Sequence, residues 1–413
     1  MIRVATFNAA NLFSRPDFLK GGGRPSDRRV GMVEFQDKTE QRLARRISEA
    51  TLTLIERQLT AQVVLDADAD FIALQEIDDL AALTLFRDDF VHPSLVPRMA
   101  RALQVILPAV HREADQLFGL AASPARDEWL AKAMDAHRKT VSERLFYNQA
   151  EVIEGNDRRG IDLGFLSRLA PTAVVSHAHV TFDDVGLWSG EVAAALVSDW
   201  RQRGEQGPMP DGRTRVFRRD CVMVELEVDG SPLTIFNCHF KSNASGGRDK
   251  AYPLREAEVR VLVSILRRRF PNPADGNWII CGDLNDYVDV DGMPAMFNLK
   301  TGLAYRSALK PLLAPQPEGL GAFDVNQWIA DPTDRWTSYF PLEDIYSQLD
   351  HILISPALFA ANVDRPTNER QPRVLRRGLP WSVERAPPRY PGVGLHDPKA
   401  SDHAAIAIDL EIP

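Results

Sequence analysis

The sequence of 413 residues predicts an α/β fold, because apolar strands and an amphipathic helix alternate along its first part. Residues 2–8 form an apolar run that predicts a buried first strand ending in Asn8. From about Lys38 to Leu65, apolar residues recur at helical spacing, which indicates an amphipathic helix. Residues 70–76 then form a short apolar strand that ends in Glu76.

Similar apolar runs predict the remaining strands. We expect them at residues 160–167, 221–228, 233–239, 278–281, 349–354 and 404–410. Several runs alternate in polarity and several are continuously apolar, as in sheets that pack against each other with helices outside. Residues 253–270 predict a further helix that ends at Pro271.

Two long segments interrupt this pattern. Residues 95–146 are rich in Ala and Leu at helical spacing and predict a helical insertion, which either caps the site or enlarges a helical layer. Residues 361–400 form a connection rich in Pro and Arg. Length alone suggests two or three domains. However, the polar clusters run from Asn8 to His403 and have to meet, so we predict a single domain over residues 1–413.

Composition excludes some classes of protein. A net charge of −8 disfavours a protein that simply coats nucleic acid, but a nuclease can obtain a positive field from a bound cation or a local basic patch. Cys221, Cys238 and Cys281 have apolar neighbours and are expected to be reduced core thiols. With no signal peptide and no apolar run long enough to span a membrane, we expect a cytoplasmic protein.

Short polar clusters stand where the apolar runs end. They are Thr6-Phe7-Asn8, Gln75-Glu76, Arg159-Gly160-Ile161-Asp162, Asn237-Cys238-His239, Gly282-Asp283-Leu284-Asn285, Asp350-His351 and Ser401-Asp402-His403. Strand ends that carry carboxylates, amides and histidines predict one metal-assisted active site. The reaction that we expect of such a site is cleavage of a phosphoester.

The cluster after residues 278–281 is the most informative of these. Gly282 lets the backbone approach a ligand closely. Asp283 and Asn285 point to the same side of an extended chain, so one can hold or deprotonate a water while the other donates to a phosphoryl oxygen. An Asx-type turn after the strand explains the same residues equally well.

The acidic residues predict the kind of metal. Glu76 beside Asn8 and Asp402 makes an oxygen-rich site that suits Mg²⁺ or Mn²⁺. The histidines do not show zinc spacing.

A carboxylate beside a histidine fixes its tautomer and stabilises its protonated form. Asp350 is our candidate for this role, whereas His351, one residue on, is expected to face away and pack in its strand.

Taken in order, and extended by Leu166-Ser167-Arg168 and Phe240-Lys241-Ser242, these clusters resemble the endonuclease/exonuclease/phosphatase superfamily. This group includes deoxyribonuclease I, exonuclease III, neutral sphingomyelinases and inositol polyphosphate 5-phosphatases. The resemblance covers essentially the whole chain apart from residues 95–146 and 361–400. It implies a four-layer α/β/β/α sandwich, with two mixed β-sheets packed face to face, helices outside, and the site at one end of the sheets.

The resemblance also implies roles for eight residues. Glu76 would be the main metal ligand, with Asn8 beside it and Asp402 near the metal. Asp283 would orient or deprotonate the attacking water, and Asn285 would assist at the phosphoryl group. His403, held by Asp350, would contact the phosphoryl oxygens. His239 would make a second phosphate contact.

The sequence departs from the family in two ways. Some members have an acidic residue two positions after the first Asn, where this chain has Ala10, which puts a second metal ligand from this strand in doubt. The tyrosine and basic elements with which apurinic endonucleases grip abasic DNA are not recognisable, so that specialisation is not expected.

The substrate has to be inferred from local features. Between Arg365 and Arg389, seven arginines stand against two glutamates, and we expect Arg376 and Arg377 to bind phosphate, although a solvated surface loop has the same composition. Arg159 and Lys241 are further candidates for substrate binding. Trp336 could stack on a base or simply pack. There is no exposed apolar hairpin for lipid insertion, which disfavours a sphingomyelinase-like role.

The combined prediction is a Mg²⁺- or Mn²⁺-dependent phosphodiesterase or nuclease that acts on nucleic acid or a nucleotide by in-line attack of water on phosphorus. The alternatives are a phosphomonoesterase acting on inositol or lipid phosphates and a non-catalytic binding member of the family. Such a binding member would have lost site residues, whereas all eight are present here.

Overall fold

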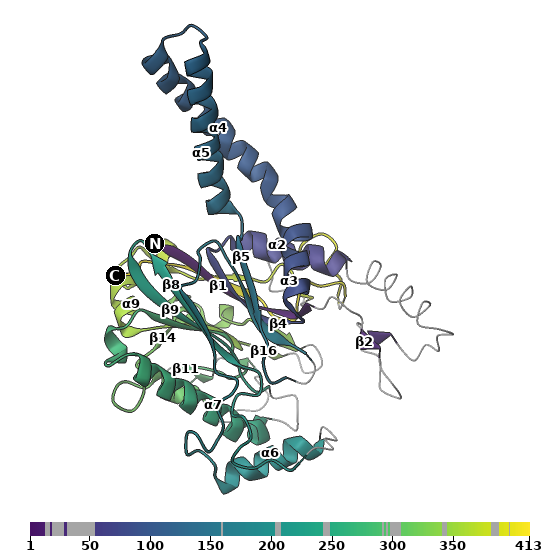
Figure 1. The fold of residues 1–413 in the computed structure, drawn as a ribbon. Helices are drawn as coiled ribbons and strands as arrows, with labels where there is room; N and C mark the ends of the chain where they lie inside the picture. The colour runs from purple at the N-terminus through teal and green to yellow at the C-terminus, as the bar shows by residue number, and fades with distance from the viewer. Residues whose placement is uncertain are drawn as a thin grey trace.

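The protein is described by a computed structural model that covers residues 1–12, 17–18, 29–30, 54–157, 160–202, 208–242, 248–290, 293–294, 296–297, 307–340, 345–380, 388–395 and 397–413. Two six-stranded sheets pack face to face, with helices on their outer faces (Figure 1). This arrangement confirms the predicted α/β/β/α sandwich.

The first sheet brings the two ends of the chain together. Its strand order is β18 (Arg373–Leu375), β19 (Ala405–Leu410), β1 (Ile2–Leu12), β4 (Phe71–Ile77), β6 (Asp162–Ser167) and β5 (Gln149–Ile153). Strand β1 is parallel to β4 and antiparallel to β19, so the sheet is mixed. The first and last strands of the sequence are therefore hydrogen-bonded neighbours.

The second sheet aligns three of the predicted site residues. Its order is β14 (Phe323–Asp324), β17 (Asp350–Ile354), β10 (Trp278–Asp283), β9 (Ser231–His239), β8 (Cys221–Val228) and β7 (Ala173–Ser176). Asp283 is in register with His239 on one side and with Asp350 on the other. Strand pairing alone thus places these three residues in one row.

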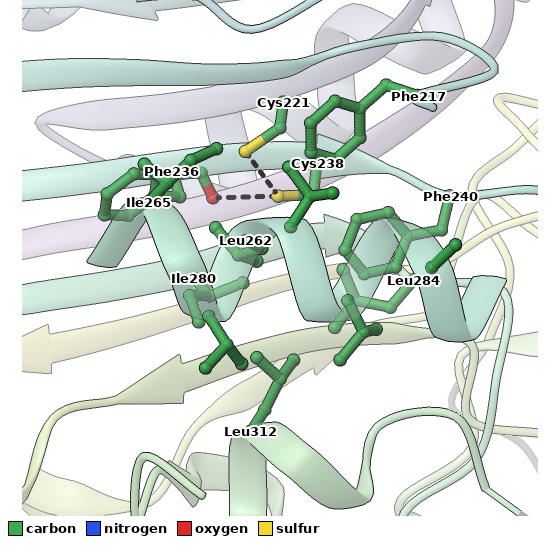
Figure 2. Close-up of a cluster of buried hydrophobic side chains, with 14 of the residues drawn as sticks. Phe217, Cys221, Phe236, Cys238, Phe240, Leu262, Ile265, Ile280, Leu284 and Leu312 are labelled. Atoms are coloured by element: carbon green, nitrogen blue, oxygen red, sulfur yellow. Dashed lines mark hydrogen bonds between the residues drawn. The ribbon is translucent and has the colours of Figure 1, made fainter. Parts of the chain in front are cut away.

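Alternation along β10 explains how the layers hold together. Ile279 and Cys281 point into the apolar core between the two sheets, while Trp278 and Ile280 point to the outer face. A strand that is buried on both faces has a continuously apolar sequence, as this one does. Figure 2 shows the outer core, where Ile280 packs against Leu262 of helix α7 (Arg248–Arg269).

The helices form the two outer layers. Helices α2 (Leu54–Ala67) and α3 (Leu80–Phe86), with the π-helical turn η1 (Arg87–Val91), cover the first sheet. Helices α6 (Gly190–Gln202), α7 and α8 (Lys310–Leu313) cover the second. Shorter helices and turns are α9 (Pro356–Asn362), α10 (Thr367–Arg370), η2 (Pro273–Asp275), η3 (Val325–Trp328) and η4 (Pro332–Asp334).

Short strands make up smaller sheets beside the sandwich. They are β2 (Asp17–Phe18), β3 (Arg29–Val30), β11 (Asp289–Val290), β12 (Met293–Pro294), β13 (Met296–Phe297), β15 (Ser338–Phe340) and β16 (Ile345–Ser347).

The segment predicted as a helical insertion consists largely of α4 (His92–Phe118) and α5 (Pro124–Leu145). The two helices pack against each other and extend away from the sandwich as a hairpin (Figure 1). Neither of our two interpretations, a cap on the site or a thicker helical layer, fits this arrangement. Helical spacing predicted the two helices but carried no information on the direction in which the hairpin leaves the sandwich.

Three other expectations can be compared with the structure. The predicted helix from Lys38 to Leu65 corresponds in its second half to α2, and residues 38–53 lie outside the described residues. The connection predicted over residues 361–400 contains α10 and the edge strand β18. All three cysteines are free and buried. No helix in the described ranges has the length and apolar character to cross a membrane.

Candidate active site

Asp283 is the centre of the candidate site. It is the last residue of β10, beside the last residue of β9 and the first residue of β17. From the facing sheet, the Asn8 Nδ2 donates a hydrogen bond of 3.1 Å to the Asp283 Oδ2. The two sheets therefore meet at this end through a polar contact, whereas the core between them is mostly apolar.

Two histidines flank the same carboxylate. The Nε2 of His239 lies 3.5 Å from the Asp283 Oδ2, and the Nε2 of His403 lies 3.9 Å from it. The other ring nitrogen of His403, Nδ1, is 2.8 Å from the Asp350 Oδ2. Asp350 thus fixes the orientation of His403, as the sequence led us to expect of this pair.

The charges of these groups depend on each other. Burial raises the pKa of Asp283 to about 7; His403 opposes this rise, whereas the negative charges of Asp350 and Glu76 add to it. Burial alone would lower the pKa of His403, but the carboxylates of Asp350 and Asp283 outweigh burial and raise it well above 6.5. The histidine is therefore a cation at neutral pH, beside a carboxyl group that can gain or lose a proton there.

Unusual backbone conformations surround the site. Glu76, Asn285 and Ala10 have φ values of +64°, +52° and +50°. Positive φ is uncommon in residues other than glycine, and such residues cluster at functional sites. Each of these three stands at or just beyond a strand end that carries a predicted site residue.

The structure adds a local reason for Gly282. Its φ is +135°, and a Cβ there would lie 1.9 Å from the carbonyl oxygen of Cys238. Glycine is required because β10 approaches the neighbouring strand β9 closely. The prediction that this position also lets the backbone approach a ligand stays a prediction.

Asp283 and Asn285 are brought together by a turn. The backbone N–H of Asn285 donates to the Asp283 Oδ1 over 3.0 Å, so the Asx-type turn that we considered as an alternative is present. The Asn285 Nδ2 donates to the carbonyl of Phe240 over 3.1 Å. Our argument from an extended chain was wrong, because the chain has already left the strand at Asn285. The turn and a catalytic role are compatible, since the second oxygen of Asp283 faces the histidines.

Hydroxyl groups fix two of the strand ends. The Ser401 Oγ donates to the carbonyl of Asn8 over 2.7 Å and accepts from the backbone N–H of His403 over 2.9 Å. The Thr337 Oγ1 accepts from the backbone N–H of Asp350 over 3.1 Å. Ser401 stood in a polar cluster, but Thr337 did not, and no pattern in the sequence connects it to a residue 13 positions away.

Asn237 has a structural role that we did not predict. Its Nδ2 donates to carbonyls of Leu74 and Gly164 in the opposite sheet, and its Oδ1 accepts from the Gln75 Nε2 over 2.8 Å. This amide pair joins the sheets beneath the site.

The oxygen-rich end of the sandwich fits a divalent cation. Potential ligand atoms of Asp283, Asp350 and His403 lie within 4.8 Å of one another, and of these the two carboxylates can bind a cation while His403 is protonated. The Oδ1 of Asp350 is buried and has no hydrogen-bond partner among the residues described here. Buried carboxylate oxygens that lack donors are the ligands that Mg²⁺ and Mn²⁺ prefer.

The predicted metal ligands lie around the same group. Asn8 touches Asp283 directly, and the charge of Glu76 is close enough to raise the pKa of Asp283. Asp402 is exposed, and its charge contributes to the raised pKa of His403. The roles of Asn8, Glu76 and Asp402 as metal ligands remain predictions.

Two of the predicted substrate-binding residues, Lys241 and Trp336, are buried. Arg159 lies outside the described residues. Lys241 is only 4% exposed, and its Nζ lies 3.4 Å from the Asp199 Oδ1. Trp336 is 2% exposed and packs against Tyr346. Neither Lys241 nor Trp336 is open to a substrate, because the first forms a buried ion pair and the second belongs to a small apolar core.

The two arginines of the 361–400 segment have structural contacts. The Cζ of Arg376 lies 4.4 Å from the centre of the Trp336 ring, and its Nε donates to the carbonyl of that residue over 3.0 Å. Arg377 lies over the ring of Tyr390 at 4.7 Å and is 3.7 Å from the Asp66 Oδ2. These contacts give no support to the prediction that the pair binds phosphate. Residue type indicated the chemistry of the arginines, but not their partners.

Comparison with known proteins identifies the family. Residues 47–403 match the profile of the Endonuclease/Exonuclease/phosphatase family. Similar solved structures include truncated Caenorhabditis elegans TDP2, with 12% identity, a TM-score of 0.42 and coverage of 98% of this chain and 95% of that chain.

Two others are a mannosyl-6-phosphatase of Bacteroides thetaiotaomicron and the 3′ phosphatase NExo from Neisseria bound to a product DNA hairpin. Each has 13% identity, a TM-score of 0.42 and complete coverage of both chains. No curated protein matches the sequence. The structural similarities are too distant to indicate a substrate. The profile match, however, extends over most of the chain and confirms the predicted relationship: the chain belongs to the endonuclease/exonuclease/phosphatase family.

Proposed function

We propose that the protein is a divalent-metal-dependent phosphodiesterase or nuclease, in which Asp283 activates a water molecule for in-line attack on phosphorus. Members of the family are generally hydrolytic phosphoesterases. The observation that carries the proposal is the position of the Asp283 Oδ2, which contacts Asn8 and lies within 4 Å of the Nε2 atoms of both His239 and His403.

Asp283 is suited to act as a general base. A base is most effective when its pKa lies near the working pH, and burial raises the pKa of Asp283 to about 7. Its Oδ1 is occupied by the backbone N–H of Asn285, which fixes the plane of the carboxylate and leaves the Oδ2 for water. No covalent intermediate is required.

The neighbouring side chains supply positive charge and protons to the phosphoryl group. Protonated His403 donates from its Nε2, because its Nδ1 is held by Asp350. His239 contributes a second ring nitrogen, and Asn285 an amide. Mg²⁺ or Mn²⁺ held by Glu76, with Asn8 and Asp402 beside it, would polarise the phosphoryl oxygens.

The charge of the site favours a diester over a monoester. A phosphate monoester carries about 1.5 to 2 negative charges at neutral pH, whereas a diester carries one. Before a cation binds, the carboxylates of Asp283, Asp350 and Glu76 outnumber the protonated His403, so the less charged substrate meets less repulsion. A bound Mg²⁺ or Mn²⁺ reduces this difference.

The proposal is tested by hydrolysis of bis-p-nitrophenyl phosphate and p-nitrophenyl phosphate with added Mg²⁺ or Mn²⁺. We expect the diester to be the better substrate and EDTA to abolish turnover reversibly. Asp283→Asn should lower kcat by about 10²- to 10⁴-fold while leaving Mg²⁺ affinity, measured by calorimetry, nearly unchanged. Glu76→Ala should lower both activity and metal affinity.

The matched control is Asp135→Asn, which removes a carboxylate that is 81% exposed on the helical hairpin. This variant should behave as wild type in both assays. Full activity in EDTA, or an active Asp283→Asn protein, would contradict the proposal. Hydrolysis of the monoester alone would overturn the diester assignment and leave the metal chemistry standing.

A further inference from the structure

A pocket of about 420 Å³ lies beside the site, outside the residues discussed so far. Leu196 and Trp200 of α6 form one wall, and the segment that leads into β8 forms another with Arg213, Arg215 and Arg218. Asn156, from the connection between β5 and β6, completes the lining on the side of the first sheet. Its volume falls within the range of small-molecule sites.

Short contacts connect this pocket to the candidate active site. Lys241 follows His239 by two residues, a span of at most about 7 Å. The Lys241 Nζ lies 3.4 Å from the Asp199 Oδ1, and the other oxygen of Asp199 lies 3.6 Å from the Arg218 Nη2. Asp199 directly precedes Trp200 in α6. The inner wall of the pocket is therefore two ion pairs away from the strand end that carries His239.

The lining of the pocket combines positive charge with an aromatic ring. Three arginines contribute to it, against a single carboxylate, Asp211. Arg213 is 85% exposed and pairs with Asp211 over 2.9 Å. The Arg215 Nη1 donates to the Asn156 Oδ1 over 2.6 Å. A guanidinium group has five N–H donors, so both arginines can hold these contacts and still bind an anion.

Trp200 provides a second indication of a ligand. Its ring lines the pocket, and its Nε1 is buried without a hydrogen-bond partner in the described part of the chain. Because this nitrogen has almost no accessible surface, a ligand in the pocket would contact the ring and not the N–H. Indole rings also bind the flat faces of nucleobases.

We propose that this pocket is a second substrate subsite, in which the arginines bind a phosphate and Trp200 contacts the ring of a neighbouring nucleotide. The inference rests on the proposed function and adds the substrate class, a nucleotide diester with a further phosphate. The scissile phosphate would lie at Asp283, and the adjacent nucleotide would reach the pocket across the protein surface, because Lys241 and Asp199 between the two sites are buried. Guanidinium groups suit this role because they bind phosphate through paired hydrogen bonds.

Kinetics with two substrates test the inference. One is a 5′-phosphorylated dinucleotide, which reaches both sites, and the other is bis-p-nitrophenyl phosphate, which reaches Asp283 alone. Arg213→Ala should lower kcat/KM for the dinucleotide about tenfold or more, because a charged hydrogen bond is lost. The same change should leave kcat/KM for the small diester within about twofold.

Further variants separate binding from folding. Trp200→Leu should lower kcat/KM for the dinucleotide but not for the small diester. Trp200→Phe, which keeps a ring, should lower kcat/KM for the dinucleotide less. Arg138→Ala is the matched control, since Arg138 is a 63% exposed arginine paired with an aspartate on the helical hairpin. Arg138→Ala should leave kcat/KM unchanged for both substrates. If Arg213→Ala lowers kcat/KM equally for both substrates, or for neither, the proposed subsite would be wrong.

A binding experiment distinguishes failure of the subsite from failure of the proposed function. Calorimetric titration with adenosine 5′-monophosphate should show binding that weakens in Arg213→Ala, whereas adenosine should bind less tightly than the nucleotide. If the nucleotide binds in this way but the small diester is not hydrolysed, the subsite stands and the proposed chemistry fails. If the small diester is hydrolysed but Arg213→Ala binds the nucleotide as wild type does, the chemistry stands and the subsite fails.

Discussion

In the proposed mechanism, Asp350 acts on the substrate through His403, which makes it a positioning residue. Its carboxylate holds the Nδ1 of that ring and raises its pKa. We expect Asp350→Asn to lower kcat by about 10²- to 10⁴-fold. In addition, the pKa of His403 should fall, so the alkaline limb of the pH profile of kcat/KM should move to lower pH. A loss of activity with an unchanged alkaline limb would contradict this assignment, and Asp135→Asn serves as the control.

His351 stabilises the fold in its protonated form. It is fully buried, as we expected of a strand histidine, and its two ring nitrogens face the Asp324 Oδ2 at 3.0 Å and the carbonyl of Asp286 at 2.9 Å. Both of these groups are acceptors, so the ring donates to each when it carries two protons. The Gln348 Nε2 also lies 2.9 Å from the Nδ1 and donates to the Asp324 Oδ2 over 2.7 Å. Burial lowers the pKa of His351, but the hydrogen bond and charge of Asp324 outweigh burial and raise it above 6.5.

This pair should make stability dependent on pH. A histidine whose pKa is raised in the folded state contributes fully to the free energy of unfolding below about pH 6.5. This contribution is lost as the pH rises through the raised pKa. Asp324→Asn should therefore lower the free energy of unfolding by about 3 to 5 kcal/mol near pH 6 and by less near pH 9. Urea unfolding at both pH values measures the difference. If the difference in free energy of unfolding between wild type and Asp324→Asn is as large at pH 9 as at pH 6, the ring is neutral in the folded protein.

At the scale of elements, the helical hairpin is largely independent of the sandwich. Helix α5 has no buried residue, and the buried residues of α4 are Leu95, near its start, and Val110 and Ala114, further along the hairpin. Replacing residues 102–137 with a short Gly-Ser linker should leave a cooperatively folded protein. Its kcat/KM for the small diester should stay within about threefold of wild type, because exposed insertions can be removed without disturbing a core.

Circular dichroism during thermal unfolding, together with the diester assay, tests this expectation. Removal of the hairpin tip alone, residues 116–125, is the milder control. A folded but inactive deletion protein would show that the hairpin serves the site, as the first of our two original interpretations required.

Burial on both faces determined which elements could be predicted from sequence. Strands such as β10 and β17 are covered on both sides and have continuous apolar runs, so their positions and their polar ends were visible. Strand β18 is three residues long and lies at a sheet edge, and nothing distinguishes it from the connection around it. The candidate site followed from the same logic, whereas the burial of Lys241 and Trp336 could not be predicted, because their surroundings come from distant segments.

At the scale of the whole molecule, the two ends of the chain lie side by side. Ile2 is in register with Leu410 across the β1–β19 pair, and Figure 1 shows the termini close together. A circular permutant that joins residues 413 and 1 through a short Gly-rich linker, with new ends at Leu120, should fold and hydrolyse the diester. Leu120 is 86% exposed at the hairpin tip, where a break disturbs no core contact.

The matched permutant has its new ends between Leu284 and Asn285, which breaks the turn that holds Asp283. It should be inactive even if it folds. Equal activity of the two permutants would contradict the geometry of the site that we describe.

The pairing of β1 with β19 also links activity to protein synthesis. Asn8 leaves the ribosome long before Ser401, which lies 393 residues further along the chain. Until Ser401 and β19 arrive, β1 lacks its neighbour on one edge, and the carbonyl of Asn8 lacks its bond from the Ser401 hydroxyl. If the proposed mechanism holds, a chain that stops before His403 therefore lacks a complete hydrolytic centre.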